Sequence, residues 1–370
     1  MFSKQALLTA VAAAFIVGLI TSLAVRPPSA PADGAAQTTA DGRVVERIRW
    51  RIPLSSSRNL PGSGETQIWM ADAVSKASGG GIRFQLFDPG EVVPAFAITD
   101  AVRDRKVPAG HTWLGYDQGK IPASALFGAT PFGLRPWAYI GWWFFGDGEK
   151  LANEIYAEHN MKPLLCGITG PETAGWYAEP IESLDDIQGL KIRFAGIGGK
   201  IMQRAGASIT MLPAGEIFQA LETGVIDATE YSQPITDQAL GFSRIAKYNY
   251  YPGWHQPFSA SHLVVNLDIW NSISGADREL IHMLCSAATG RHLGMTESLQ
   301  GEIIKGFPEI GVTAMETPVQ ILRELEGHAA VVLDEDAAKD ADFARVLASQ
   351  RAFKENHDFW RRLAYLPREF

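Results

Sequence analysis

Arg193 is the residue of this sequence whose type and setting point most directly to chemistry. It stands between Ile192 and Phe194, in a stretch (190–194) whose alternation of polar and apolar residues predicts a strand. A guanidinium in apolar surroundings needs an anionic partner, and it can hold a carboxylate through two parallel hydrogen bonds. Taken alone, Arg193 fits a structural ion pair better than a ligand site, so neighbouring segments must decide.

Three further segments place polar side chains where predicted strands end. Residues 169–176 follow an apolar strand, residues 228–231 end in an acid beside an aromatic ring, and residues 251–256 combine aromatic and polar side chains. In open α/β sheets, ligands bind beyond the carboxyl ends of the strands. We therefore expect these segments to surround one cleft together with Arg193.

Motifs for several other chemistries do not fit. Residues 196–200 (GIGGK) resemble a nucleotide loop, but Ile201 stands where the loop needs glycine, serine or threonine. The sequence has no nucleophile elbow and no zinc-protease motif. The sequence has 33 Lys and Arg against 41 Asp and Glu, and it has no basic block. This composition argues against binding of nucleic acid through a basic surface. A hydrolase that uses Glu172 and Glu230 as paired acids stays open as an alternative.

The elements that must position these residues alternate between strand and helix after residue 43. With 370 residues, 46 % of them hydrophobic, the chain can form more than one compact unit. This order predicts an α/β fold whose sheets have parallel character, followed by a helical C-terminal third from residue 276. The expected strands are 49–52, 82–86, 112–114, 164–167, 190–194, 209–212, 225–228 and 259–267, and the expected helices include 67–77, 96–102, 137–145, 196–202 and 214–221.

The N-terminus predicts export from the cytoplasm. Lys4 precedes an uncharged apolar run (6–25), which Arg26 and two prolines end. This pattern is typical of a secretory signal, here assigned to residues 1–30 with a linker over 31–43. About 20 apolar residues can also span a bilayer, so a retained anchor, as in a membrane-bound sensor, is the alternative.

Two local features have a packing interpretation. Cys166 and Cys285 both lie in apolar stretches, and we expect buried free thiols rather than a disulfide, although an exported chain could form one. The aromatic segment 137–145 is expected to pack into the core rather than to stack on a ligand.

Six motifs make the chain resemble a known family. They are DPGEVVP (88–94), GPETAGW (170–176), GLKIR (189–193), LPAGE (212–216), LETGVIDATE (221–230) and YPGWH (251–255). Over nearly all of residues 45–370 the chain resembles the substrate-binding proteins of tripartite ATP-independent periplasmic (TRAP) transporters. Within that family it is most similar to the binders of 2-oxo acids and lactate.

The resemblance implies an α/β, two-lobed periplasmic-binding-protein fold of type II-like arrangement, with crossing strands, a long hinge helix and a helical C-terminal tail. It places one lobe at residues 44–165 with 258–310, the second at 166–257, and the C-terminal helices at 311–370. It implies a non-catalytic periplasmic receptor without a catalytic cofactor. Such a receptor would close over a small organic acid, here a 2-oxo or 2-hydroxy monocarboxylate, and deliver it to TRAP membrane subunits.

The resemblance also implies a binding site. Arg193 is expected to clamp the substrate carboxylate. The other expected substrate contacts are Glu172, Tyr116, Glu230, Tyr231, Trp176, His255 and Asn59.

A sodium or calcium ion is expected at Glu172, Tyr231 and Gln256. Members of this kind usually carry Gln, Trp and Glu at these three positions, so the chain exchanges the amide and the carboxylate. Hard cations accept both kinds of oxygen, and the total charge of the groups around the ion need not change. Without a metal, Glu172 would form an ion pair with Arg193 or bind a hydroxyl or amine of the ligand.

The helical tail (320–365) carries apolar residues that could form a homodimer. They are Phe343, Val346, Leu347, Phe353, Phe359, Trp360 and Leu363. The alternative is a tail that folds back on its own lobe.

Overall fold

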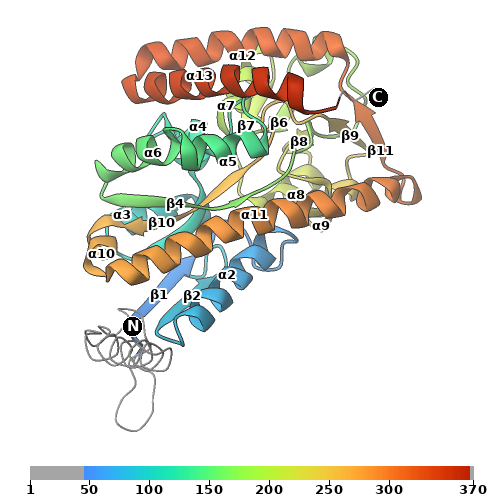
Figure 1. The fold of residues 1–370 in the computed structure, drawn as a ribbon. Coiled ribbons are helices and arrows are strands. Elements are labelled where there is room, and N and C mark those ends of the chain that lie inside the picture. The colour runs from blue at the N-terminus through green and yellow to red at the C-terminus, as the bar shows by residue number, and fades with distance from the viewer. Residues whose placement is uncertain (1–45, 367–370) are drawn as a thin grey trace, which may run out of the picture.

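The computed structural model describes residues 46–366, which form two lobes (Figure 1). In the first lobe, β1 (Ile48–Pro53) and β2 (Ile82–Phe87) pair in parallel, with α2 (Ser63–Ala77) connecting them. A bridge between Leu54 and His111 joins β1 to β3 (Ala109–Trp113). Next to β3 lie β10 (Ala260–Asn266) and then β4 (Met161–Ile168), with antiparallel pairing throughout.

The helices of the first lobe cover these strands. The aromatic helix α5 (Pro136–Phe145) buries Tyr139, Trp142 and Trp143 completely, which confirms its expected place in the core. The other helices of this lobe are α3 (Ile98–Arg103), α4 (Ser124–Gly128), α6 (Gly148–Ala157) and α10 (Leu267–Ser272), which pack on β3, β10 and β4.

The second lobe contains a six-stranded mixed sheet in the order β11-β9-β5-β8-β6-β7. Its members are β11 (Thr313–Glu316), β9 (Tyr248–Tyr251), β5 (Gly175–Tyr177), β8 (Ala228–Thr229), β6 (Lys191–Arg193) and β7 (Ser208–Thr210). Strand β6 runs parallel to both β7 and β8, as the sequence pattern predicted. Helices α7 (Gly196–Arg204), α8 (Ala214–Glu222) and α9 (Pro234–Ala239) flank this sheet.

Helix α11 (Gly275–Lys305) connects the lobes along one side (Figure 1). Its 31 residues extend over about 46 Å at the rise of an α-helix. It packs against β4 and α2 of the first lobe and against α9 of the second. The predicted lobe boundaries at residues 166 and 257 fall inside β4 and shortly before β10, and they stay predictions.

The C-terminal tail folds back on its own chain in its first half. Helix α12 (Val319–Lys339) packs on α7, and α13 (Ala341–Ala364) packs on α4, α5 and α6. Phe343, Val346 and Leu347 are buried there, whereas Phe359 and Trp360 each remain 61 % exposed.

Cys166 of β4 and Cys285 of α11 form a disulfide, so the expectation of free thiols was wrong. Both apolar stretches do enter one core cluster, with Ile52, Met70 and Leu263. Burial alone therefore does not distinguish a thiol from a bridge; what decides is that β4 and α11 pack side by side.

Residues 1–45, with the predicted signal or anchor, lie outside the described residues. Within residues 46–366, none of the helices combines the length and the apolar character that a bilayer crossing requires.

Candidate functional site

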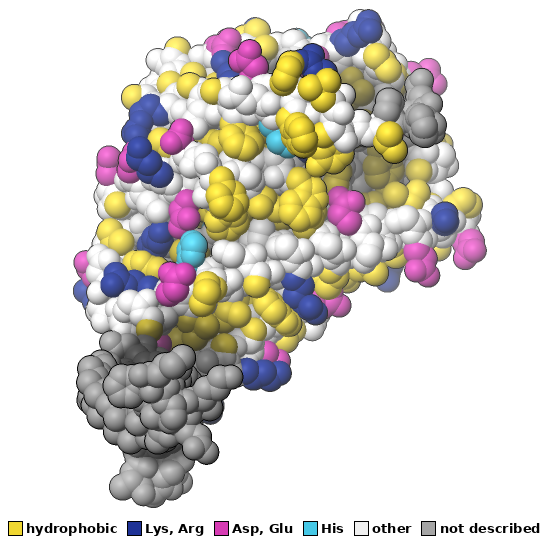
Figure 2. All heavy atoms as spheres, viewed as in Figure 1, with side chains coloured by type: hydrophobic (Ala, Val, Ile, Leu, Met, Phe, Trp, Pro, Cys, Tyr) yellow, Lys and Arg dark blue, Asp and Glu magenta, His cyan; other side chains and the backbone are white. Residues whose placement is uncertain are grey.

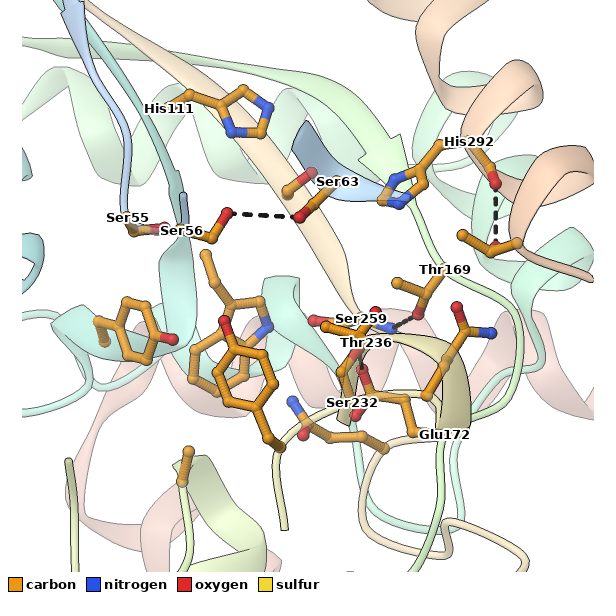
Figure 3. Close-up of a pocket in the computed structure, with 18 of the residues that line it drawn as sticks. Ser55, Ser56, Ser63, His111, Thr169, Glu172, Ser232, Thr236, Ser259 and His292 are labelled. Carbon is orange, nitrogen blue, oxygen red and sulfur yellow. Dashed lines mark hydrogen bonds between the residues drawn. The ribbon is translucent and has the colours of Figure 1, made fainter. Parts of the chain in front are cut away.

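A cavity of about 80 Å³ lies between the two lobes and is lined by side chains from both. The first lobe contributes mainly Ser55, Ser56, Ser63, Gln67, His111, Trp113, Tyr116 and His292, and the second contributes Glu172, Arg193, Tyr231, Ser232, Gln233, Thr236 and Gln256. Thr169, directly after β4, and Ser259, directly before β10, also line the cavity. Figure 3 shows the polar side chains directed into it.

Arg193 is the last residue of β6 and is almost fully buried. One guanidinium nitrogen, Nη1, donates to the Glu230 carboxylate at 2.7 Å and to the Glu230 carbonyl at 2.6 Å. Nε donates to the Leu212 carbonyl at 3.2 Å. The guanidinium also lies over the Tyr231 ring, 5.3 Å from its centre. These contacts fix the guanidinium in place at the cavity wall.

Tyr116 meets Arg193 from the first lobe. Burial raises the pKa of the Tyr116 hydroxyl, while the neighbouring Arg193 charge and a hydrogen bond to Arg193 act in the opposite direction. The phenol is therefore a neutral donor at the cavity wall beside the guanidinium.

Glu230 follows β8 and is completely buried. Its Oε1 accepts from Arg193 and from the Ala195 backbone N–H at 2.6 Å, and its Oε2 lies 3.4 Å from His255 Nε2. Burial alone would raise the pKa of Glu230, but the Arg193 charge and the His255 hydrogen bond lower it below its usual value. Glu230 is therefore an ionised carboxylate that holds Arg193.

Glu172 is a second buried carboxylate, and no side chain of residues 46–366 forms an ion pair with it. Its Oε1 accepts from the Ser232 hydroxyl at 3.3 Å, and its Oε2 has no partner among the described residues (Figure 3). Burial, together with Glu230 and Asp237, raises the pKa of Glu172 well above its usual value. An ion that bound here would satisfy the free oxygen.

The donor set at this place suits a hard cation. Glu172, Glu230 and His255 each offer an atom within 4.8 Å of the others. Glu172, Tyr231 and Gln256 all line the cavity, with carboxylate, phenol and amide oxygens. Sodium and calcium accept such oxygens, so the residues present fit the expected ion.

The predicted contacts separate into three groups. Glu172, Arg193, Tyr116, Tyr231 and Gln256 line the cavity together. Glu230 and His255 lie behind them, where Glu230 holds Arg193 and His255 contacts Glu230.

Trp176 and Asn59 lie away from the cavity lining. The Trp176 indole N–H donates to Asp237 at 2.8 Å inside the second lobe, and its ring packs against Phe307. Asn59 is exposed in the segment before α2. Trp176 lies in the core of the second lobe, and the motif that contains it does not show where its side chain points.

Sequence reasoning missed most of the first-lobe wall. Ser55 and Ser56 directly follow β1, and Ser63 and Gln67 lie in the first two turns of α2. The rule that ligands bind beyond strand ends, applied to residues 49–52, would have pointed to the serines. His111 and His292 carry no such signal, because only the pairing of β3 and the course of α11 bring them together.

Comparison with known proteins identifies the family. Residues 61–340 match the sequence profile of DctP, described as bacterial extracellular solute-binding protein, family 7. The chain belongs to this family. A Nostoc sp. protein named monocarboxylate 2-oxoacid-binding periplasmic protein is 32 % identical over 325 residues, which cover 88 % of this chain and 89 % of that protein.

Solved structures agree. A TRAP transporter solute-binding protein of Bordetella bronchiseptica, a mixed-occupancy dimer with calcium and picolinate bound, is 27 % identical with a TM-score of 0.84. The match covers 86 % of this chain and 94 % of that one. A TRAP solute-binding protein of Pseudoalteromonas atlantica with bound sodium and pyruvate is 27 % identical, with a TM-score of 0.83 and coverages of 86 % and 97 %.

The protein is accordingly a TRAP-type solute receptor of a periplasmic binding family, and it is not an enzyme. The site agrees with this assignment, because Glu230 already accepts from Arg193 and from Ala195. A carboxylate held in this way is not free to act as one of two hydrolytic acids.

Proposed function

We propose that the receptor binds a small 2-oxo or 2-hydroxy monocarboxylate in the interlobe cavity and delivers it to TRAP membrane subunits. The observation that carries this proposal is Arg193, a guanidinium that is buried at the cavity wall and held from behind by Glu230. A buried carboxylate is stable only when it is paired, and Arg193 with the Tyr116 hydroxyl supplies the pairing groups.

The charges around the cavity favour an accompanying cation. Glu230 offsets the charge of Arg193 across 2.7 Å, so a bound carboxylate and an ionised Glu172 would leave two negative charges together. Burial of unpaired charges is costly. We propose that Glu172, Tyr231 and Gln256 would hold a sodium or calcium ion in the cavity, and that this ion would supply the positive charge that the ligand carboxylate and Glu172 need.

The remaining predicted contacts take different roles in this proposal. Arg193 and Tyr116 hold the ligand carboxylate, while Glu230 and His255 position Arg193. Trp176 and Asn59 take no part in ligand binding in this proposal, because neither lines the cavity.

The decisive test is Arg193→Ala. Loss of the guanidinium removes the only cationic side chain that lines the cavity among the described residues, so binding of pyruvate and lactate should fall at least a hundredfold by calorimetry. Thermal stabilisation by these acids should vanish as well. The exposed Arg204→Ala on α7 is the matched control and should bind like the unaltered protein. Unchanged affinity in Arg193→Ala would contradict the proposal.

We also propose that the protein forms a homodimer through the C-terminal end of α13. Apolar side chains remain exposed there, namely Phe359, Trp360, Leu363, Tyr365 and Leu366. Tyr365 and Leu366 border a hollow of about 830 Å³ between α13, α5 and α11, and Figure 2 shows hydrophobic side chains gathered on this face. A patch of this kind is typical of an interaction surface.

A further inference from the structure

The cavity wall opposite Glu172 and Ser232 is polar but carries no charged side chain. This distal wall consists of Ser56, Ser63, His111 and His292 (Figure 3), together with Gln67, which contacts His111. It combines residues from the start of α2, from β3, from α11 and from the segment after β1. An apolar ligand tail such as a branched alkyl chain would leave these polar groups without partners.

Both imidazoles of the distal wall are neutral near pH 7. Burial lowers the pKa of His111 to about 3, with His292 adding to the effect, and burial lowers the pKa of His292 to about 4. A neutral imidazole offers one donor and one acceptor. The wall therefore suits an uncharged group that can both donate and accept, whereas a second anion or an amine would find no opposite charge there.

Two buried atoms of the distal wall have hydrogen-bonding capacity to spare. The Gln67 amide nitrogen lies 3.0 Å from His111 Nδ1, which leaves Gln67 Oε1 without a partner among the described residues. His292 Nδ1 is likewise buried and unpartnered among those residues. Buried polar groups are nearly always satisfied in functional states of proteins.

The size of the cavity limits the ligand. A cavity of about 80 Å³ is small, so it suits an acid of few carbon atoms and leaves no room for a long tail.

We propose that the distal wall binds a hydroxyl group on the ligand tail, so that the receptor prefers a three- or four-carbon hydroxylated monocarboxylate over the same acid without that hydroxyl. This inference rests on the proposed function of the site. The tail hydroxyl donates to Gln67 Oε1 or to an imidazole nitrogen and accepts from Ser56, Ser63 or the second imidazole. Sites that hydrogen-bond a substrate hydroxyl discriminate strongly against analogues that lack it, because their polar groups are then left unpaired.

Calorimetry with matched acid pairs tests this preference. The pairs are glycerate against lactate, both as separate enantiomers, and 3-hydroxypyruvate against pyruvate. We expect the hydroxylated acid of each pair to bind at least tenfold more tightly. Equal or tighter binding of lactate and pyruvate would overturn the inference while leaving the proposed function intact. Failure of all four acids to bind would overturn the proposed function, and the inference with it.

Two variants locate the preference on the distal wall. In Gln67→Leu the affinity for glycerate should fall at least tenfold, and the ratio between glycerate and lactate should approach one. Ser56→Ala, at a half-exposed position, should lower the same ratio severalfold and remains informative if Gln67→Leu fails to fold. Ser57→Ala, whose hydroxyl is not among those that line the cavity, is the matched control and should keep the full preference. A full preference in both Gln67→Leu and Ser56→Ala would contradict the assignment.

Discussion

Arg193 shows how the site prepares for an anion before one arrives. Its guanidinium is already desolvated and held by Glu230 and by the Leu212 carbonyl, so a ligand does not have to order a flexible side chain. Glu230 is in turn anchored by the Ala195 N–H. Contacts within the fold therefore offset the desolvation of Arg193, and ligand binding does not have to compensate for it.

Glu172 is the residue at which the proposed cation can be tested. We expect Glu172→Gln to lower the sodium or calcium dependence of pyruvate binding at least tenfold in calorimetric titrations with and without a chelator. The physical reason is that the substitution removes the carboxylate with the unpartnered Oε2. The exposed Glu182→Gln is the matched control. A metal dependence that survives in Glu172→Gln would exclude Glu172 as a ligand of the ion.

The raised pKa of Glu172 adds a further expectation for the same titrations. Without a bound ion, the buried Glu172 carboxyl holds its proton more readily than an exposed carboxyl does. A cation that binds to Glu172 must displace that proton. Metal binding should therefore release protons and strengthen as the pH rises.

His262 gives a prediction for stability against pH. Burial lowers the pKa of His262 to about 3, whereas the unfolded chain titrates near 6.5. The unfolded state thus binds the extra proton first, and the stabilising effect of the neutral ring, complete above pH 6.5, is lost as the pH falls toward 3. As the pH is lowered from 6 to 4, the free energy of unfolding should fall more steeply in the unaltered protein than in His262→Phe. The two slopes should differ by about 1.4 kcal/mol per pH unit. Urea unfolding at several pH values measures this, and equal slopes would contradict it.

At the scale of elements, the disulfide links strand β4 to helix α11. Cys166 and Cys285 are separated by 119 residues, so their bond closes a long loop in the unfolded chain. The double variant Cys166→Ala/Cys285→Ala should lose about 2–4 kcal/mol of stability in urea unfolding. Reductant should destabilise the unaltered protein similarly and leave the double variant unaffected. Equal stability of the two proteins under oxidising conditions would contradict this expectation.

Elements that lie in a periodic stretch of sequence could be predicted, even where the element itself is short. The pattern of residues 67–77 and 214–221 indicated helices that the structure contains as parts of α2 and α8, and the alternation of residues 190–194 indicated the three-residue strand β6. Strands β5 and β11 have three and four residues, and no alternating stretch predicted them. They exist because the neighbouring strand β9 supplies their hydrogen bonds, which is tertiary information.

The same distinction applies to the site. Arg193 and Glu230 could be predicted because each stands at the end of an apolar strand of the second lobe. The distal wall could not, since Gln67 and His292 lie on helices far apart in sequence and come to one cavity wall only because α11 packs on α2. For Trp176, the motif gave the right segment but not the face of the strand to which the side chain points.

At the scale of the whole molecule, the proposed dimer makes a direct prediction. Light scattering should give a mass near twice that of one chain for the unaltered protein, and the mass of one chain for Trp360→Glu/Leu363→Glu. Two charges placed in the exposed apolar end of α13 would oppose burial of that surface. Val225→Glu, at an exposed position in the second lobe, is the matched control and should remain dimeric. A single-chain mass for the unaltered protein would refute the dimer.

The oxidation state of Cys166 and Cys285 also depends on the compartment in which the protein folded. Such bonds persist in oxidising surroundings and are rare where glutathione and thioredoxin keep thiols reduced. Protein produced in the cytosol and exported protein would have the same residues 46–366. They would differ in whether this disulfide is formed. Melting temperatures compared between laboratories are therefore meaningful only when the redox history of each sample is the same.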